Sequence, residues 1–401
     1  MSAQLRIVVG AVGLAGHTLP ALALSAELSR RGHRVLFHGY RRWQPLAESL
    51  GLDFAGDEDQ IVSQLAPDTP VAELSRALAK SITAFGADVV VGDGLTMTPV
   101  IAAELLDIPR ATLFPEVYPR TEAGMPFFSL GLVAPRTAAG RAAWRVARPL
   151  LARRLPSTRW LRGAEASLNR ERAHLGLSPA SGSDPAPPGA LTLVATLPQL
   201  EYPRSWPARV RVTGPLSLDP DPREPEWPRG HGPLVLVAPS TVKDPDGRLL
   251  NLVAEALVDE SVRLLITTSG APRPKLGRLP RGVVVTDWVD YSRVMTEAAL
   301  VICHGNHGTV VAALGAGTPV LVVPAMDDDA EHGARVTWAG VGAMVPSALC
   351  KAATLRAVVR RLLADPAYAR RAQEIARWSE LNPGKAAAAD LVERLVEAGP
   401  G

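Results

Sequence analysis

Apolar and polar positions alternate along the N-terminal part of the chain with two periods, one typical of strands and one of helices. A β-branched run at residues 5–9 predicts a strand, and a loop containing glycines follows at residues 10–16. Apolar residues at helical spacing predict a helix over residues 19–31, which Gly32 ends. Residues 34–38 predict the next strand. Strand, helix and strand in this order indicate a parallel sheet.

The same alternation returns at residues 88–114, with a strand (88–92), a loop (93–98), a helix (99–106) and a strand (110–114). Residues 115–177 are instead rich in aromatic residues and proline, and then in arginine. The arginines of this helical part include Arg136, Arg141, Arg145, Arg148, Arg153 and Arg154. We interpret the stretch as an insertion on the first domain. Its basic surface is either solvated or binds a membrane or an anionic partner.

A proline-rich stretch at residues 215–232 has neither helical nor strand periodicity, so it predicts a linker. Beyond it the alternation restarts, with strands predicted at residues 233–238, 263–267, 283–285, 300–303 and 319–324 and helices at 249–257, 294–298 and 310–316. We therefore predict an α/β protein with two doubly wound, Rossmann-like domains that face a cleft. They occupy residues 1–214 and 233–382, and a C-terminal helical segment follows at residues 383–401.

The composition fits a soluble globular protein of two domains. At 401 residues the chain exceeds what one core usually serves, and its apolar fraction of 47% and charged fraction of 21% are near globular averages. We find no apolar run of bilayer length, no signal-peptide pattern, and no metal or disulfide spacing for Cys303 and Cys350. A net charge of +3 does not indicate nucleic-acid binding. We expect a cytoplasmic monomer or homodimer without stable membrane insertion.

Two polar residues at predicted strand ends are candidates for acid–base chemistry. His17 lies just before the predicted first helix and faces the crevice, where an imidazole can take a proton near neutral pH. Asp93 ends a strand of the same domain and can hold one ring nitrogen of His17, which leaves the other nitrogen basic. The alternative interpretations are a histidine that makes only local hydrogen bonds and an aspartate that caps a helix.

Residues 300–336 contain a third candidate site, suited to an anion and a polyhydroxylated ligand. A buried strand leads into His304-Gly305-Asn306-His307-Gly308-Thr309, where a predicted helix begins and its unpaired N–H groups can bind a phosphate. The glycines allow the backbone to approach closely. A second strand leads to Asp327, Asp328 and Asp329, whose carboxylates can accept hydrogen bonds from hydroxyl groups. The alternative is a turn followed by solvated carboxylates.

Five segments of the chain carry a resemblance to a known family: GHTLPALALSAELSRRGHRV (residues 16–35), VTGPL (212–216), DWV (287–289), HGNHGT (304–309) and DDAEHGARV (328–336). The chain resembles family 1 glycosyltransferases of the GT-B fold, especially the bacterial enzymes that glycosylate polyketides, macrolides and aromatic natural products. The resemblance spans nearly the whole chain. It implies sugar transfer from a nucleotide-diphosphate donor to a hydrophobic small molecule, with no metal or other cofactor. It also implies a terminal helix that crosses back to the first domain.

The resemblance further implies roles for individual residues. His17 is the general base and Asp93 its partner in a single displacement that we expect to invert the anomeric configuration. The implied donor-binding residues hold the distal phosphate (Ser240, Thr241), the nucleobase (Trp288, Val289), the diphosphate (His304, Gly308 and Thr309, with Gly305 and Asn306 in the same loop) and the sugar (Asp328, Asp329).

Three departures from the family pattern concern the donor. Val289-Asp290-Tyr291 follows Trp288 where the family commonly has x-Pro-Gln, and Asp329 replaces a common glutamine. Ala312 replaces a glutamate that holds ribose hydroxyls. Because alanine cannot accept those hydrogen bonds, we expect a thymidine diphosphate donor, whose deoxyribose has one hydroxyl fewer, in preference to uridine diphosphate.

An aromatic, proline-rich insertion suits a flat apolar acceptor. The side chains that we predict to contact it are Phe114, Tyr118, Phe127, Phe128 and Trp144.

Parts of the sequence are compatible with other functions. A nicotinamide-dependent oxidoreductase also opens with a strand, a glycine loop and a helix, but needs G-x-G-x-x-G and an acidic residue at the end of the second strand. Here the glycines are Gly10, Gly13 and Gly16, and the strand ends in His38-Gly39-Tyr40. The acidic pairs in residues 57–59 and 244–246 fit a D-x-D metal pattern that is common by chance. A catalytically inactive GT-B-like auxiliary protein remains open, although the presence of both candidate catalytic residues argues against it.

Overall fold

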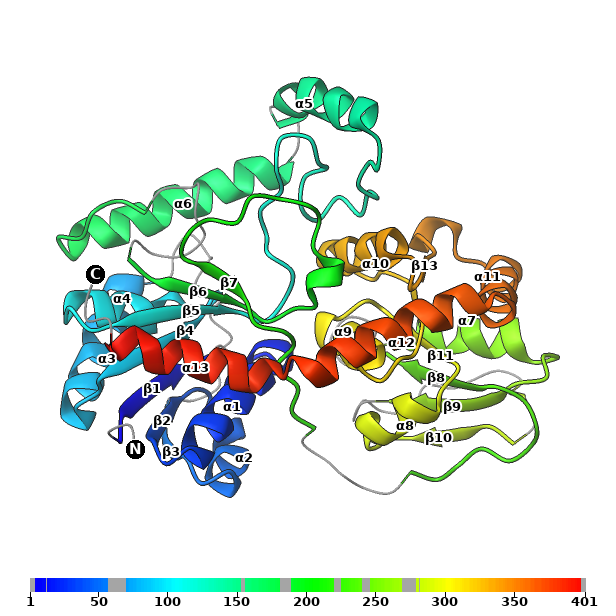
Figure 1. Ribbon diagram of the computed structural model, residues 1–401, viewed down its shortest axis with the longest axis horizontal. Coiled ribbons are helices and arrows are strands. Elements are labelled where there is room, and N and C mark those ends of the chain that lie inside the picture. Colours follow the sequence, from blue (N-terminus) through cyan, green and yellow to red (C-terminus); the bar gives the residue numbers. More distant parts are fainter. Residues whose placement is uncertain are drawn as a thin grey trace.

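The computed structural model describes residues 4–11, 13–56, 70–152, 156–180, 189–219, 225–239, 246–268, 279–280 and 282–397, and of residues 156–162, 164 and 327 the backbone alone. Two parallel sheets, each covered by helices, stand side by side (Figure 1). The first sheet has the order β3-β2-β1-β4-β5-β6-β7 and the second the order β10-β9-β8-β11-β12-β13. This arrangement confirms the predicted α/β fold of two doubly wound, Rossmann-like domains.

The first domain carries the seven-stranded sheet. Its strands are β1 (Arg6–Gly10), β2 (Arg34–His38), β3 (Asp53–Ala55), β4 (Val89–Asp93), β5 (Arg110–Phe114), β6 (Leu191–Val194) and β7 (Val210–Val212). Its helices are α1 (Ala15–Arg30), α2 (Gln44–Ser49), α3 (Val71–Phe85), α4 (Met97–Leu105), α5 (Ala138–Ala152) and α6 (Pro156–His174), with the 3-10 helices η1 (Arg41–Trp43) and η2 (Pro198–Leu200). The central strand β4 is buried along its whole length, because helices cover both faces of a parallel sheet.

The second domain repeats this architecture on six strands. The strands are β8 (Leu234–Ala238), β9 (Arg263–Thr267), β10 (Val284–Thr286), β11 (Leu300–Cys303), β12 (Val320–Val322) and β13 (Gly342–Met344). The helices are α7 (Arg248–Leu257), α8 (Tyr291–Glu297), α9 (His307–Gly315), α10 (Asp327–Ala339), α11 (Ala352–Ala364) and α12 (Pro366–Leu381), with the 3-10 helix η3 (Ser347–Leu349). The last helix of the chain is α13 (Gly384–Glu397).

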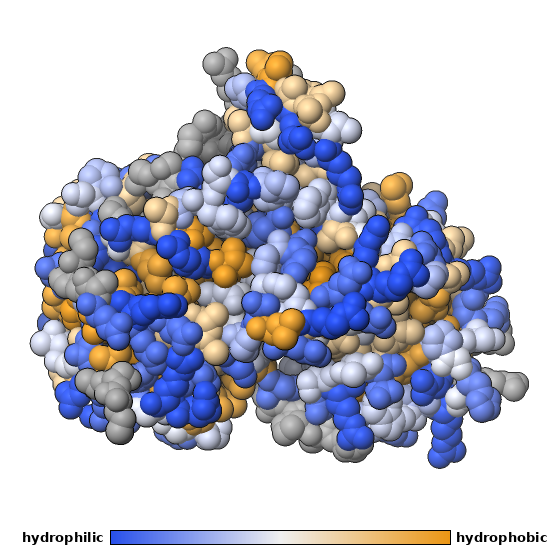
Figure 2. Space-filling view, in the orientation of Figure 1, coloured by the Kyte–Doolittle hydropathy of each residue, from blue (hydrophilic) through white to orange (hydrophobic). Residues whose placement is uncertain are grey.

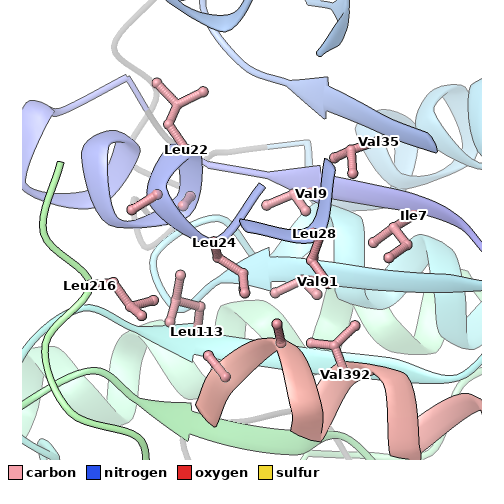
Figure 3. Packing of buried hydrophobic residues seen from close by; sticks show 14 of the residues in the cluster. Ile7, Val9, Leu22, Leu24, Leu28, Val35, Val91, Leu113, Leu216 and Val392 are labelled. Atoms are coloured by element: carbon pink, nitrogen blue, oxygen red, sulfur yellow. The ribbon is translucent and has the colours of Figure 1, made fainter. Parts of the chain in front are cut away.

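Helix α13 returns from the second domain and packs on α1 and β4 of the first. Its Val392 is fully buried in one core with Val91 of β4 and Leu28 of α1 (Figure 3). At the rim of this contact, Arg31 donates hydrogen bonds to Asp390 at 2.6 Å and to Glu393 at 2.9 Å. The C-terminal helix is therefore part of the core of the first domain.

The two stretches of chain that join the domains pass close to each other. Gly214 precedes the linker and has a φ of +94°, and a β-carbon there would lie 3.3 Å from the carbonyl oxygen of Asn382. A β-carbon on Gly384, at the start of α13, would lie 2.4 Å from the carbonyl oxygen of Pro215. This close approach of backbones requires glycine at residue 384.

The structure corrects the predicted start of the first helix. α1 begins at Ala15 and not near Leu19, so His17 lies within its first turn and not before it. The carbonyl of Leu14 accepts hydrogen bonds from the amides of His17 at 3.0 Å and Thr18 at 2.8 Å. The loop predicted at residues 10–16 extended too far, because Ala15 and Gly16 already belong to the first turn of the helix.

The insertion between β5 and β6 contains α5 and α6, and α5 projects from the body of the first domain (Figure 1). Within the described residues, no helix combines the length and the apolar composition that crossing a bilayer requires.

Candidate active site

Parallel strands bring their carboxyl ends to one edge of the sheet, and the two candidate catalytic residues of the first domain lie at that edge. Strands β1 and β4 are neighbours, with Gly10 opposite Gly92. His17 follows β1 in the first turn of α1, and Asp93 is the last residue of β4. The register of the sheet therefore brings these two side chains together.

The imidazole of His17 and the carboxylate of Asp93 form a hydrogen bond of 2.6 Å between Nδ1 and Oδ1. Because a carboxylate only accepts hydrogen bonds, Nδ1 donates and the lone pair of the neutral ring lies on Nε2. The second carboxylate oxygen accepts from the amide of Leu95 at 3.1 Å and from the hydroxyl of Thr96 at 3.3 Å. Helix α4 begins later, without a side-chain cap, so Asp93 is not its N-cap.

Burial and acidic neighbours act in opposite directions on the pKa of His17. Burial lowers it, but the Asp93 carboxylate, with help from Glu116 and Asp328, outweighs this and raises the pKa to about 9. The free protein therefore holds His17 protonated at neutral pH. Asp328 belongs to α10 of the second domain, so the two domains approach each other at His17.

The loop between β11 and α9 has the shape of an anion site. Gly305 has a φ of +108°, and a β-carbon there would lie 2.8 Å from the backbone oxygen of Asp329, so the position requires glycine. Nδ1 of His332 donates to the carbonyl of Gly305 at 2.8 Å and holds the loop in place. Asn306 is the N-cap residue of α9, and a β-carbon on Gly308 would meet no atom within 4 Å. The first amides of α9 are therefore open to a ligand at this glycine.

The other residues predicted around this loop differ in exposure. His304 is buried, whereas Thr309 and Asp328 are half-buried. Asp329 is fully buried, and its Oδ2 accepts hydrogen bonds from the amides of Ala325 at 3.2 Å and Met326 at 3.0 Å. Asp329 therefore fixes the turn before α10, and its contact with a donor sugar stays a prediction.

Trp288 and Val289, predicted at the nucleobase, lie between β10 and α8. Val289 is buried in the hydrophobic core, and Trp288 is half-buried with its ring edge-on to Tyr291 at a centroid distance of 6.5 Å. Ser240 and Thr241, predicted at the distal phosphate, lie outside the described residues.

The five aromatic residues predicted at the acceptor do not share one environment. Phe114, at the end of β5, and Tyr118 are buried and meet edge-on at 6.3 Å. Phe127 lies under an arginine of α5, Phe128 packs against the core of the second domain, and Trp144 belongs to α5. Contact of these residues with an acceptor stays a prediction.

The sequence reasoning missed a buried ionic network between the domains. Arg335 of α10 donates to Glu331 at 2.8 Å and, across the interface, to Glu201 at 3.0 Å. Glu331 also accepts from the amide of Ser129 at 3.2 Å. Burial raises the pKa of Glu331, although Arg335 opposes this. The i, i+4 spacing of Glu331 and Arg335 was the signal available in the sequence, and it does not identify the partner in the first domain.

The chain is similar to known proteins in both sequence and fold. Residues 250–397 match the family described as erythromycin biosynthesis protein CIII-like, C-terminal domain. The chain is 27% identical to 4'-demethylrebeccamycin synthase from Lentzea aerocolonigenes. The match covers 98% of this chain and 99% of that enzyme.

Two crystal structures illustrate the similarity of fold. The calicheamicin glycosyltransferase CalG4 has a TM-score of 0.76 at 24% identity, with 99% of each chain covered. The glycosyltransferase VinC, solved in complex with dTDP, has a TM-score of 0.70 at 20% identity, with 98% of this chain and 100% of VinC covered. The chain is a glycosyltransferase of the GT-B fold with an EryCIII-like C-terminal domain, related to the glycosyltransferases of antibiotic pathways.

Proposed function

We propose that the protein transfers a sugar from a nucleoside-diphosphate donor to a hydroxyl or nitrogen atom of a hydrophobic natural product, with inversion at the anomeric carbon. The observation that carries the proposal is the hydrogen bond between His17 and Asp93, formed within electrostatic reach of Asp328 of the second domain. It supports a base on the first domain that works opposite the anion loop of the second.

In the proposed step, Nε2 of His17 removes a proton from the acceptor atom as that atom attacks the anomeric carbon. The bond from the anomeric carbon to the diphosphate oxygen breaks in the same in-line displacement, so the configuration inverts. The amides at the start of α9, with His304 and Thr309, stabilise the charge of the leaving diphosphate. Asp93 stabilises the imidazolium ion that forms.

We propose that the reaction needs neither a metal ion nor an organic cofactor. Activation of the acceptor is assigned to a side chain, and stabilisation of the leaving group to backbone amides and an imidazole. Turnover measured after treatment with EDTA should equal untreated turnover, and a loss that magnesium restores would contradict this part of the proposal.

We further propose thymidine diphosphate as the nucleotide of the donor. Ala312 of α9 presents a methyl group where the family resemblance places a glutamate, and a buried ribose hydroxyl without a partner costs about 1–3 kcal/mol. The ring of Tyr291 lies edge-on to that of Trp288, and its hydroxyl is hydrogen-bonded to the hydroxyl of Thr267 at 2.8 Å. Tyr291 therefore occupies the space beside Trp288. VinC, which shares the fold, binds dTDP. Calorimetric titration should show tighter binding of thymidine diphosphate than of uridine diphosphate, and the opposite order would contradict the choice.

The proposed acceptor class rests on the relatives of the chain and on the aromatic residues of the first domain. A panel of polycyclic aromatic and macrolide aglycones, incubated with dTDP-glucose and analysed by mass spectrometry, tests it by the gain of one hexose. The anomeric proton coupling of the product then reports the configuration. A product that keeps the α-configuration of the donor would contradict the single displacement.

A further inference from the structure

Helix α5 exposes an apolar stripe to solvent. It has no buried residue, and it projects from the first domain (Figure 1). Val146 is 71% exposed and Leu150 63% exposed, and Ala139 and Ala143 are also exposed. At 100° per residue these four positions lie on one side of the helix.

The arginines on the opposite side of α5 face the protein. Arg148 is half-buried and donates to the carbonyls of Glu122 and Met125 at 2.9 Å each, and Arg141 donates to the carbonyl of Arg136 at 2.9 Å. The usual orientation of an amphipathic helix is thus reversed, with the charged side held by the first domain and the apolar side in water. An apolar surface maintained in this way is typical of a docking surface.

The stretch of sequence that contains the stripe is basic. Residues 123–164 contain eight arginines and neither aspartate nor glutamate. Arg145 is exposed and lies about 100° around the helix axis from Val146. Figure 2 shows hydrophobic and strongly hydrophilic residues side by side on the projection. The electrostatic complement of this region is a surface of negative charge.

A lipid bilayer fits these features better than a protein partner does. The stripe consists of alanine, valine and leucine, whereas energetically dominant residues of protein interfaces are mostly Trp, Tyr and Arg. Four small side chains on a projecting helix also cover far less than the about 800 Å² per partner of a stable complex. A bilayer surface needs no matching groove, accepts aliphatic side chains, and offers phosphates to arginine.

We propose that α5 docks the protein on the surface of anionic phospholipid membranes, with Val146 and Leu150 in the interface and Arg145 at the lipid phosphates. The helix lies on the bilayer and does not cross it. This docking is independent of the proposed sugar transfer, because vesicle binding is measured without donor or acceptor.

Co-sedimentation of the full chain with vesicles tests the proposal. The wild type should bind vesicles of phosphatidylcholine with phosphatidylglycerol, bind pure phosphatidylcholine weakly, and dissociate as salt is raised. Leu150→Asp should lower the partition coefficient about tenfold or more, and Val146→Asp similarly, since each removes an exposed apolar contact. The matched control is Leu349→Asp, because Leu349 of η3 is also 63% exposed but lies in the second domain.

Retained binding of Leu349→Asp, with thermal unfolding unchanged in all three variants, supports the proposal. Equal loss in Leu349→Asp and Leu150→Asp overturns it, and so does a wild type that does not bind anionic vesicles. If the wild type instead forms a dimer in size-exclusion chromatography that Val146→Asp dissociates, the stripe is a contact between copies of the chain and the membrane proposal is wrong.

Discussion

Nδ1 of His17 lies 2.6 Å from Oδ1 of Asp93, although 76 positions separate the two residues in the chain. The pairing of β1 with β4 creates this contact, and it leaves Nε2 of His17 as the atom that can take a proton. In the proposed mechanism histidine supplies the base, whereas aspartate sets its tautomer and raises its pKa. Replacing one or the other should therefore have different effects.

Replacement of His17 by alanine should lower turnover by about two to four orders of magnitude, because the general base is lost. Binding of thymidine diphosphate, measured by calorimetry, should stay nearly unchanged, since we place the nucleotide in the second domain. His17→Gln serves as a control that keeps polar contacts at the site. Loss of nucleotide binding, or survival of turnover, would show that His17 has another role.

The pH dependence of kcat/KM should follow the protonation of His17. The base acts when neutral, and its pKa is raised to about 9, so the rate should increase about tenfold per pH unit below that value and level off above it. An acceptor with an aliphatic alcohol avoids titration of the substrate itself. A rate that is flat from pH 6 to pH 9 contradicts the assignment.

Asp93→Asn should lower the maximal rate by less than the alanine variant of His17 does, because the base remains but its tautomer is no longer enforced. It should also shift the rising limb of the pH profile to lower pH, since the carboxylate is the main cause that raises the pKa of His17. If Asp93 had only a structural role, the substitution would change the rate without shifting the rising limb of the pH profile.

Gly305 and Gly308 lie in the same loop but should respond differently to alanine. Gly305→Ala places a side chain at a φ of +108° and 2.8 Å from a backbone oxygen, so it should destabilise the protein by about 1–3 kcal/mol and weaken nucleotide binding. Gly308→Ala meets no atom of the protein, so the melting temperature should not change. It should nevertheless weaken binding of thymidine diphosphate, because the methyl group enters the proposed anion site. Unchanged binding would mean that the diphosphate does not bind at the loop that contains Gly308.

Arg335→Ala should destabilise the protein by about 3–5 kcal/mol, because Glu201 and Glu331 then remain buried without their cation. The control is Arg360→Ala, which removes a 2.7 Å ion pair of an exposed arginine with Glu260 and should cost much less. Chemical denaturation of both variants measures the difference. If both variants lost a similar free energy of unfolding, the buried interdomain ion pairs would stabilise the protein no more than an exposed pair does.

The sequence predicted the strands that carry chemistry because long β-branched runs and loop residues mark them. Strands 34–38, 110–114, 263–267 and 300–303 have the predicted bounds. It did not predict β3, β6, β7 and β13, which have three or four residues each. β10 and β12 also have three residues each but were predicted, so short length alone does not explain these misses. The pairing of the four missed strands depends on neighbours already in place.

In the candidate site, too, local sequence patterns predicted some contacts and not others. His17 and Asp93 were identified as partners because both lie beyond or at the ends of predicted strands of one domain, where a parallel sheet gathers its loops. Glu201 was not predicted, since its partner Arg335 comes from the other domain and no local pattern connects the two. The start of α1 was misplaced for a local reason, because the glycines of residues 10–16 predicted a loop, whereas Gly16 lies inside the helix.

The return of α13 to the first domain also bears on how the chain matures during synthesis. Val392 and its neighbours occupy a core whose other members, such as Leu28, are translated at the beginning. Until the last helix leaves the ribosome, that face of α1 is exposed to water, and the first domain waits for the whole of the second. The core of the N-terminal domain is therefore completed only after the second domain has been synthesised.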